Sequence, residues 1–112
     1  MDREDIILKL KEYISVKENR VVEKETPISN ISFALMRDRL VGKGRILEEN
    51  LNIPYYIIDV KSGFLNKNSA IVFIKWNIDK LEIYAYANEG LINQHTADEV
   101  VEYLVEKIIN PV

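Results

Sequence analysis

The residues best suited to phosphate chemistry are an aspartate and a lysine near the middle of the chain. Asp59 and Lys61 stand two residues apart at the end of an apolar run. Because side chains alternate along a β-strand, both would project from the same face. Asp38, 21 residues upstream, offers a second carboxylate. Two carboxylates can hold Mg²⁺, and a neighbouring lysine can assist the water that attacks a phosphate.

This arrangement resembles that of nucleases of the PD-(D/E)xK type, and the resemblance covers only Asp38, Asp59 and Lys61. It implies a metal-dependent nuclease. In that family the Asp/Glu-x-Lys strand leads into a helix, whereas here residues 64–68 lead into another apolar run. Asp59 and Lys61 also fit a strand edge without a catalytic role, which is the interpretation that we adopt.

A basic cluster precedes this region. It consists of Arg37, Arg39, Lys43 and Arg45, with Gly42 and Gly44 between them. Such a cluster can contact an anion or a nucleic-acid backbone, with the glycines letting backbone amides approach. Two helices over about 31–41 and 45–51, followed by a hairpin, would make a winged helix. Basic residues at a helix C-terminus explain the same cluster without a ligand.

Few other residues offer chemistry. His95 is the one histidine, and the chain has no cysteine, which excludes disulfides, thiol nucleophiles and cysteine metal sites. His95 has no nearby histidine or paired carboxylate in the sequence. We therefore expect no metal site, no cofactor and no enzymatic activity.

The elements that would position these residues centre on an antiparallel β-meander, with strands at about 55–61, 69–76 and 81–87. Asn77–Lys80 carries two turn-forming residues, and counting outwards from it sets the register of the last two strands. Opposite charges and aromatic partners then face one another across the strands. On one face of the two strands, this register pairs Lys75 with Glu82, Phe73 with Tyr84 and Ile71 with Tyr86.

The meander has two unlike faces. One face is aliphatic, and small alanines at Ala70, Ala85 and Ala87 leave room for helices to pack on it. The other face carries a candidate interaction surface, made of Tyr55, Ile57, Ile71, Phe73, Tyr84 and Tyr86. Aromatic residues of this kind suit a protein interface. The sequence leaves open whether this face is exposed or covered by residues 20–53.

Helices are predicted at both ends of the chain. Ile6, Ile7 and Leu10 fall at helical spacing within Asp2–Val16, and Asp2 can cap that helix. Residues 96–99 read as a capping box before a broad apolar stripe. We expect both helices on the aliphatic face. Arg20–Thr26 fits a short edge strand, a helix is favoured over about 31–41, and 45–51 stays open between helix and strand.

Length and composition indicate one α+β domain over residues 1–112. The formal net charge is −3, with a basic middle and an acidic C-terminal third. No apolar run is long enough to cross a membrane, and the acidic N-terminus is unlike a signal peptide. These features predict a small acidic cytoplasmic protein.

The functional expectation is a non-catalytic protein-interaction module that binds a protein partner or itself, as a homodimer. The alternative is a nucleic-acid-directed protein, either a winged-helix-like binder using Arg37–Arg45 or a nuclease using Asp59 and Lys61. An acidic chain disfavours the alternative, because nucleic-acid binding usually leaves a basic footprint.

Overall fold

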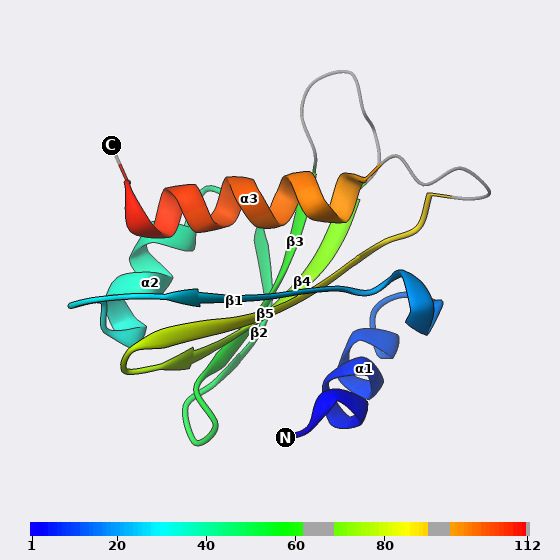
Figure 1. Ribbon diagram of the computed structural model, residues 1–112, viewed down its shortest axis with the longest axis horizontal. Helices are drawn as coiled ribbons and strands as arrows, with labels where there is room; N and C mark the ends of the chain where they lie inside the picture. Colours follow the sequence, from blue (N-terminus) through cyan, green and yellow to red (C-terminus); the bar gives the residue numbers. More distant parts are fainter. Residues whose placement is uncertain (62–68, 90–94, 112) are drawn as a thin grey trace.

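The computed structural model describes residues 1–61, 69–89 and 95–111. Its helices and strands follow one another in an α+β order along the chain (Figure 1). In that order they are α1 (Arg3–Lys11), the short 3₁₀ helix η1 (Glu18–Arg20), β1 (Val22–Pro27), α2 (Phe33–Leu40), β2 (Arg45–Asn50), β3 (Tyr55–Lys61), β4 (Ser69–Asn77), β5 (Lys80–Ala87) and α3 (Thr96–Ile109).

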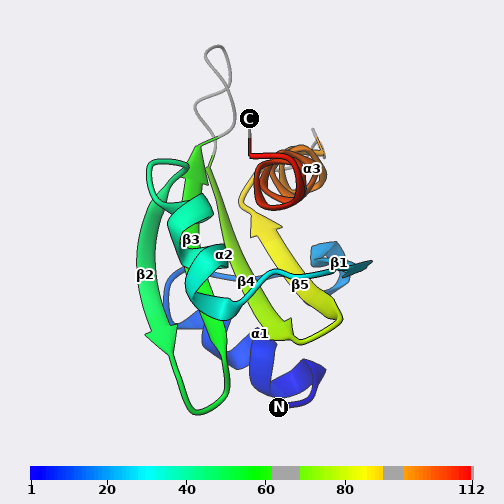
Figure 2. The ribbon, with the colours of Figure 1, turned by 90° about the vertical axis from the view of Figure 1, so that its left-hand side faces the viewer.

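The strands of the described residues form one antiparallel sheet in the order β1-β5-β4-β3-β2. The predicted meander is its centre, and β1 and β2 are added as the two edges (Figure 2). The α+β class and the helices at both ends are thus confirmed. The connection predicted between the first two meander strands, residues 62–68, lies outside the described part of the chain.

The predicted register of β4 and β5 is confirmed. Phe73 lies opposite Tyr84, and Ile71 lies opposite Tyr86. Lys75 and Glu82 also pair, with Nζ and Oε2 3.6 Å apart. The strands each extend one residue further than expected, because Asn77 pairs with Lys80 and leaves a two-residue loop.

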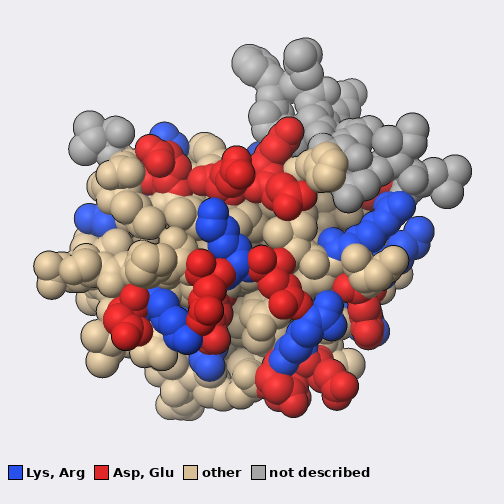
Figure 3. Space-filling model, viewed as in Figure 1, with Lys and Arg blue, Asp and Glu red and all other residues tan. Residues whose placement is uncertain are grey.

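Both edges of the sheet carry features that disfavour pairing with another strand. Three consecutive residues of β1, Glu23, Lys24 and Glu25, are charged and exposed. Figure 3 shows acidic and basic side chains interspersed over β1, with acidic side chains gathered along α3. On β2, the register shifts between Ile46 and Glu48 in a β-bulge. Charges and bulges are devices that protect sheet edges from aggregation.

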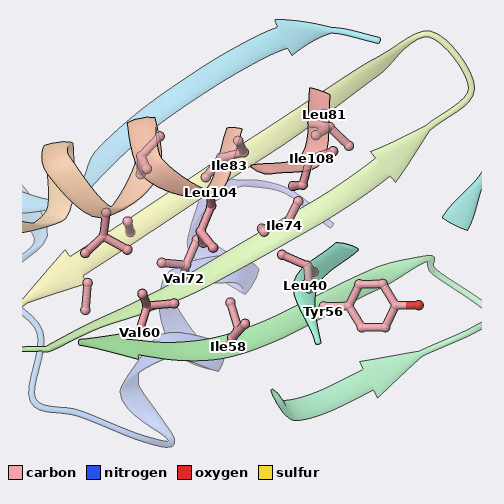
Figure 4. Packing of buried hydrophobic residues seen from close by; sticks show 14 of the residues in the cluster. Leu40, Tyr56, Ile58, Val60, Val72, Ile74, Leu81, Ile83, Leu104 and Ile108 are labelled. Carbon is pink, nitrogen blue, oxygen red and sulfur yellow. The ribbon is translucent and has the colours of Figure 1, made fainter. Parts of the chain in front are cut away.

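The aliphatic face of the sheet forms the larger core. Side chains from β3, β4 and β5 point toward α3, and Leu40 reaches the same core from α2 (Figure 4). Leu104 and Ile108 supply the apolar stripe of α3, as the sequence predicts. Helices α2 and α3 together cover this face.

The first helix occupies the opposite face, which differs from the expected placement. Ile6 and Leu10 of α1 pack with Tyr55, Ile57 and Phe73 in a separate cluster. Figure 1 accordingly places α3 above the sheet and α1 below it. The physical reason is that the sheet is apolar on both sides, so each face needs its own cover.

The structure shortens one expected helix, confirms another and decides the segment that the sequence left open. Helix α1 ends at Lys11 rather than near Val16, although Asp2 caps it as predicted. The helix expected over about 31–41 is α2, and its cap is Ser32, whose Oγ accepts from the Leu35 N–H at 3.0 Å. The segment left open at 45–51 is β2, an edge strand.

The expected capping box at residues 96–99 is also absent from the described structure. Helix α3 already includes Thr96, and the N-cap position belongs to His95 in the left-handed conformation. The Thr96 N–H donates instead to Oε1 of Glu89 at 2.6 Å. Within the described residues, none of the helices is both long and apolar enough to span a membrane.

Candidate interaction surface

The aromatic face that the sequence offers as an interaction surface is internal. Tyr55, Ile57, Ile71, Phe73 and Tyr86 are buried, and Tyr84 is half-buried. Helix α1 covers much of this face, with help from Val21 and Leu47. Tyr55, Ile57, Ile71 and Phe73 therefore belong to a second core, and Tyr84 packs against it. The face is covered within the described structure instead of being open to a partner.

The basic cluster does not converge on one surface. Arg37 pairs with Glu49 of β2 at 3.1 Å, whereas Arg39 donates to the carbonyl of Ile108 in α3 at 2.5 Å. Arg45 lies near Asp59, at 3.9 Å, on the α1 side of the sheet. Lys43 belongs to the tight turn between α2 and β2. Arg37, Arg39 and Arg45 thus contact three different parts of the fold, so the basic cluster does not form one continuous nucleic-acid surface.

The carboxylates of the nuclease hypothesis are also separated. Asp59 lies on the α1 side of the sheet, whereas Asp38 is exposed on α2, which packs on the other side. Oδ1 of Asp59 is buried and has no hydrogen-bond partner in the described structure. Among the described residues, no three acidic or histidine side chains come together as a metal site would require. Nδ1 of the exposed His95 lies 3.3 Å from Oδ2 of Asp98.

One groove on the surface of the described residues lies between α1 and the β2–β3 turn. We call it the α1 groove. It has a volume of about 340 Å³ and is lined by Met1, Asp5, Leu8, Lys9, Glu12, Asn50, Ile53 and Tyr55. Three of these side chains, Met1, Leu8 and Ile53, are large, apolar and exposed. An open apolar groove with charged rims is typical of a binding surface.

Leu8 is the most exposed apolar residue of α1, at 61% of its full accessibility. The helix buries Ile6, Ile7 and Leu10 against the sheet, which turns Leu8 outward. Asp5 and Glu12 are spaced three and four residues from Leu8, so all three lie along one side of the helix. Where α1 lines the groove, the apolar Leu8 therefore lies between the acidic Asp5 and Glu12.

A polar cluster at Glu48 fixes α1 beside this groove. Tyr13 donates to Oε1 of Glu48 at 2.6 Å, and Tyr55 donates to Oε2. Lys9 Nζ lies 3.1 Å from Oε2. Burial opposes ionisation of Glu48, but hydrogen bonds from Tyr13, Tyr55 and Lys9 outweigh it and lower its pKa. The hydrogen bond to Glu48 raises the pKa of Tyr13 to about 12.

The pKa of Glu48 predicts acid sensitivity of the α1 contact. Because this pKa is lower in the folded than in the unfolded protein, the stabilisation is present above the unfolded value, about 4.5. It is lost as the pH falls through the folded value. We expect Glu48→Gln to lower the free energy of unfolding at pH 7 by about 1–3 kcal/mol. It should also reduce the fall in stability below pH 4, measured by urea unfolding at several pH values.

The matched control for this experiment is Glu102→Gln on the exposed side of α3. It should change neither the stability at pH 7 nor the pH profile by more than about 0.5 kcal/mol. If Glu48→Gln has the same dependence of stability on pH as the wild type, the polar cluster at Glu48 does not hold α1 in place.

Sequence reasoning missed both Leu8 and Glu48. A signal for Leu8 existed, because it is an apolar residue outside the stripe formed by Ile6, Leu10 and Ile14. No comparable signal existed for Glu48, whose partner Tyr13 lies 35 residues away in the chain.

Comparisons with known proteins assign no family to this protein, so its class is described from its fold and surface. The chain matches no protein-family model, no curated protein and no solved structure. What the geometry defines is an α+β protein with a covered sheet and a groove beside α1 that exposed apolar and charged side chains line.

Proposed function

We propose that this protein is a non-catalytic protein-interaction module that associates with itself, and that the α1 groove is one of its contact surfaces. The observation that carries the proposal is the exposure of Leu8 beside Ile53 and Met1 at the groove. Covering a leucine side chain on association contributes about 1.5–3 kcal/mol. The surface therefore gains free energy when a partner covers it.

The Glu48 cluster supports a binding rather than a catalytic role for this surface. Both carboxylate oxygens already accept hydrogen bonds, from Tyr13 and from Tyr55. The pKa of Glu48 is lowered and that of Tyr13 is raised, so each group keeps its ordinary charge near neutral pH. A general acid or base needs a pKa close to the working pH. The cluster is thus suited to holding α1 in place.

The edges of the sheet disfavour association through strand pairing, so the proposed contact is one between side chains. The charges of β1 and the bulge of β2 oppose pairing with a strand of another molecule. Other exposed large apolar residues of the described chain lie elsewhere, such as Ile78 in the β4–β5 loop and Tyr103 on α3. Met1, Leu8 and Ile53 are brought together around the α1 groove.

Sedimentation equilibrium tests this proposal. We expect the apparent mass of the wild type to rise above the monomer mass of 13.0 kDa as its concentration increases. Leu8→Gln keeps helix propensity but removes the apolar contact, so the dissociation constant should rise about 10–100-fold.

The control is Ile78→Gln in the β4–β5 loop, where the apolar side chain is 75% exposed. This variant should associate like the wild type. Circular dichroism confirms that both variants fold. A wild type that stays at the monomer mass at every concentration would refute self-association.

A further inference from the structure

Two surfaces with complementary chemistry lie at opposite ends of β2. The α1 groove lies at the Asn50 end, where Asn50 and Tyr55 form part of its lining. The turn between α2 and β2 lies at the Arg45 end. We infer that the α1 groove of one molecule receives the turn Val41–Arg45 of a second copy. This inference rests on the proposed self-association and names the surface that fills the groove.

The turn Val41–Arg45 presents an apolar side chain among cations. Val41 is 54% exposed although it is aliphatic. Lys43 and Arg45 follow it at alternate positions, and residues 39–47 contain no acidic side chain. Arg45 is largely exposed and lies only loosely, at 3.9 Å, near Asp59. The turn therefore offers both an apolar contact and positive charge to a partner.

The shape of this turn is set before any partner binds. The Lys43 N–H donates to the Leu40 carbonyl at 3.0 Å, and Val41 and Gly44 form a β-bridge. Gly42 has a φ of +83°, which favours glycine. A Cβ on Gly44 would lie 2.5 Å from the carbonyl oxygen of Asp59, so only glycine fits against β3. A preformed turn loses little conformational entropy on binding.

The groove has the opposite charge. Asp5 and Glu12 stand on either side of Leu8, about 10 Å apart along the helix. Lys9 also lines the groove, but its charge is engaged by Glu48 at 3.1 Å and by Glu12 at 3.6 Å. The lining side chains thus combine apolar contacts with two carboxylates, Asp5 and Glu12, against one cation, Lys9. This formal charge of −1 complements the positive charge of the turn, and the apolar contacts suit Val41.

Charge also argues against a two-fold contact between two α1 grooves. Such an interface would bring the acidic pairs of both molecules, Asp5 and Glu12, onto one patch. Like charges brought together in an interface are unfavourable. A contact between turn and groove avoids this repulsion. It is heterologous, so each bound molecule still presents a free turn or groove and the assembly can grow.

A mixing experiment with neutral substitutions tests the inference. The groove variant is Leu8→Gln, and the turn variant combines Val41→Ser with Lys43→Gln. Each variant alone is expected to remain close to the monomer mass, because one of the two required surfaces is lost. An equimolar mixture should form a 1:1 complex, since one variant keeps an intact turn and the other keeps an intact groove. That complex should not grow further, unlike the wild type.

The outcomes separate the inference from the proposed function. If the turn variant associates like the wild type while Leu8→Gln does not, the groove binds another surface and the inference is wrong. A mixture that stays monomeric, although each variant folds by circular dichroism, also overturns it. If the wild type itself is monomeric at all concentrations, the proposed self-association fails as well.

Discussion

Replacing Phe73 by alanine is expected to lower the free energy of unfolding by about 3–5 kcal/mol. Phe73 is 0% exposed and lies between the rings of Tyr55 and Tyr84. Its centroid is 4.7 Å from that of Tyr55 in a stacked pair and 6.3 Å from that of Tyr84 in an edge contact. The truncation leaves a cavity beneath α1 and removes both aromatic contacts. Urea unfolding followed by circular dichroism measures the loss.

The matched control is Tyr103→Ala, because Tyr103 is an exposed aromatic residue on α3. Its loss should cost about 0.5 kcal/mol or less. The comparison distinguishes a covered aromatic face from an open one. If the face were open, Phe73→Ala would affect stability as little as Tyr103→Ala does, and the placement of α1 would be wrong.

The centre of the fold was predictable because its signals are local. β4 is a continuous apolar run, Ala70–Ile74, and in β5 buried and half-buried side chains alternate from Lys80 to Ala85, with a short turn between the two strands. The cross-strand pairs Lys75–Glu82 and Phe73–Tyr84 are both favourable in one register only. A shift by one residue would move every side chain to the other face. Local chemistry and the burial pattern therefore agree on a single answer.

The position of α1 was not predictable in the same way. An amphipathic stripe indicates that one side of a helix is buried, but it does not say against which surface. Both faces of this sheet are apolar, so Ile6 and Leu10 fit either of them. The choice depends on α2, whose packing on the aliphatic face leaves the aromatic face for α1. That is a property of the whole fold.

The edge strand β2 shows a second limit. A segment of six residues, Arg45–Asn50, is too short for its apolar pattern to distinguish a helix from a strand. The bulge near Leu47 also breaks the alternation of side chains between the two faces of the sheet. Leu47 and Glu48 are consecutive, yet both make contacts on the α1 side. The α1 groove was hidden for a related reason, since its walls come from residues 1–12 and 50–55.

Replacing Leu10 by alanine is expected to cost about 2–5 kcal/mol of unfolding free energy. Leu10 is fully buried in the cluster that contains Tyr55 and Phe73. Removing its side chain takes away much of the apolar contact that holds α1 on the sheet. A double-mutant cycle with Phe73→Ala should show a coupling of about 0.5–3 kcal/mol, because the two residues share one cluster. Urea unfolding of the two single variants and the double variant measures this coupling.

Leu104→Ala provides the control for the cycle, because Leu104 is equally buried but lies in the core on the other side of the sheet. Its effect should add to that of Leu10→Ala within about 0.5 kcal/mol. Strong coupling to Leu104 instead of Phe73 would place α1 on the aliphatic face. The same cycle bears on function, because α1 supplies one wall of the groove. Leu10→Ala should therefore weaken self-association without altering any residue that lines the surface.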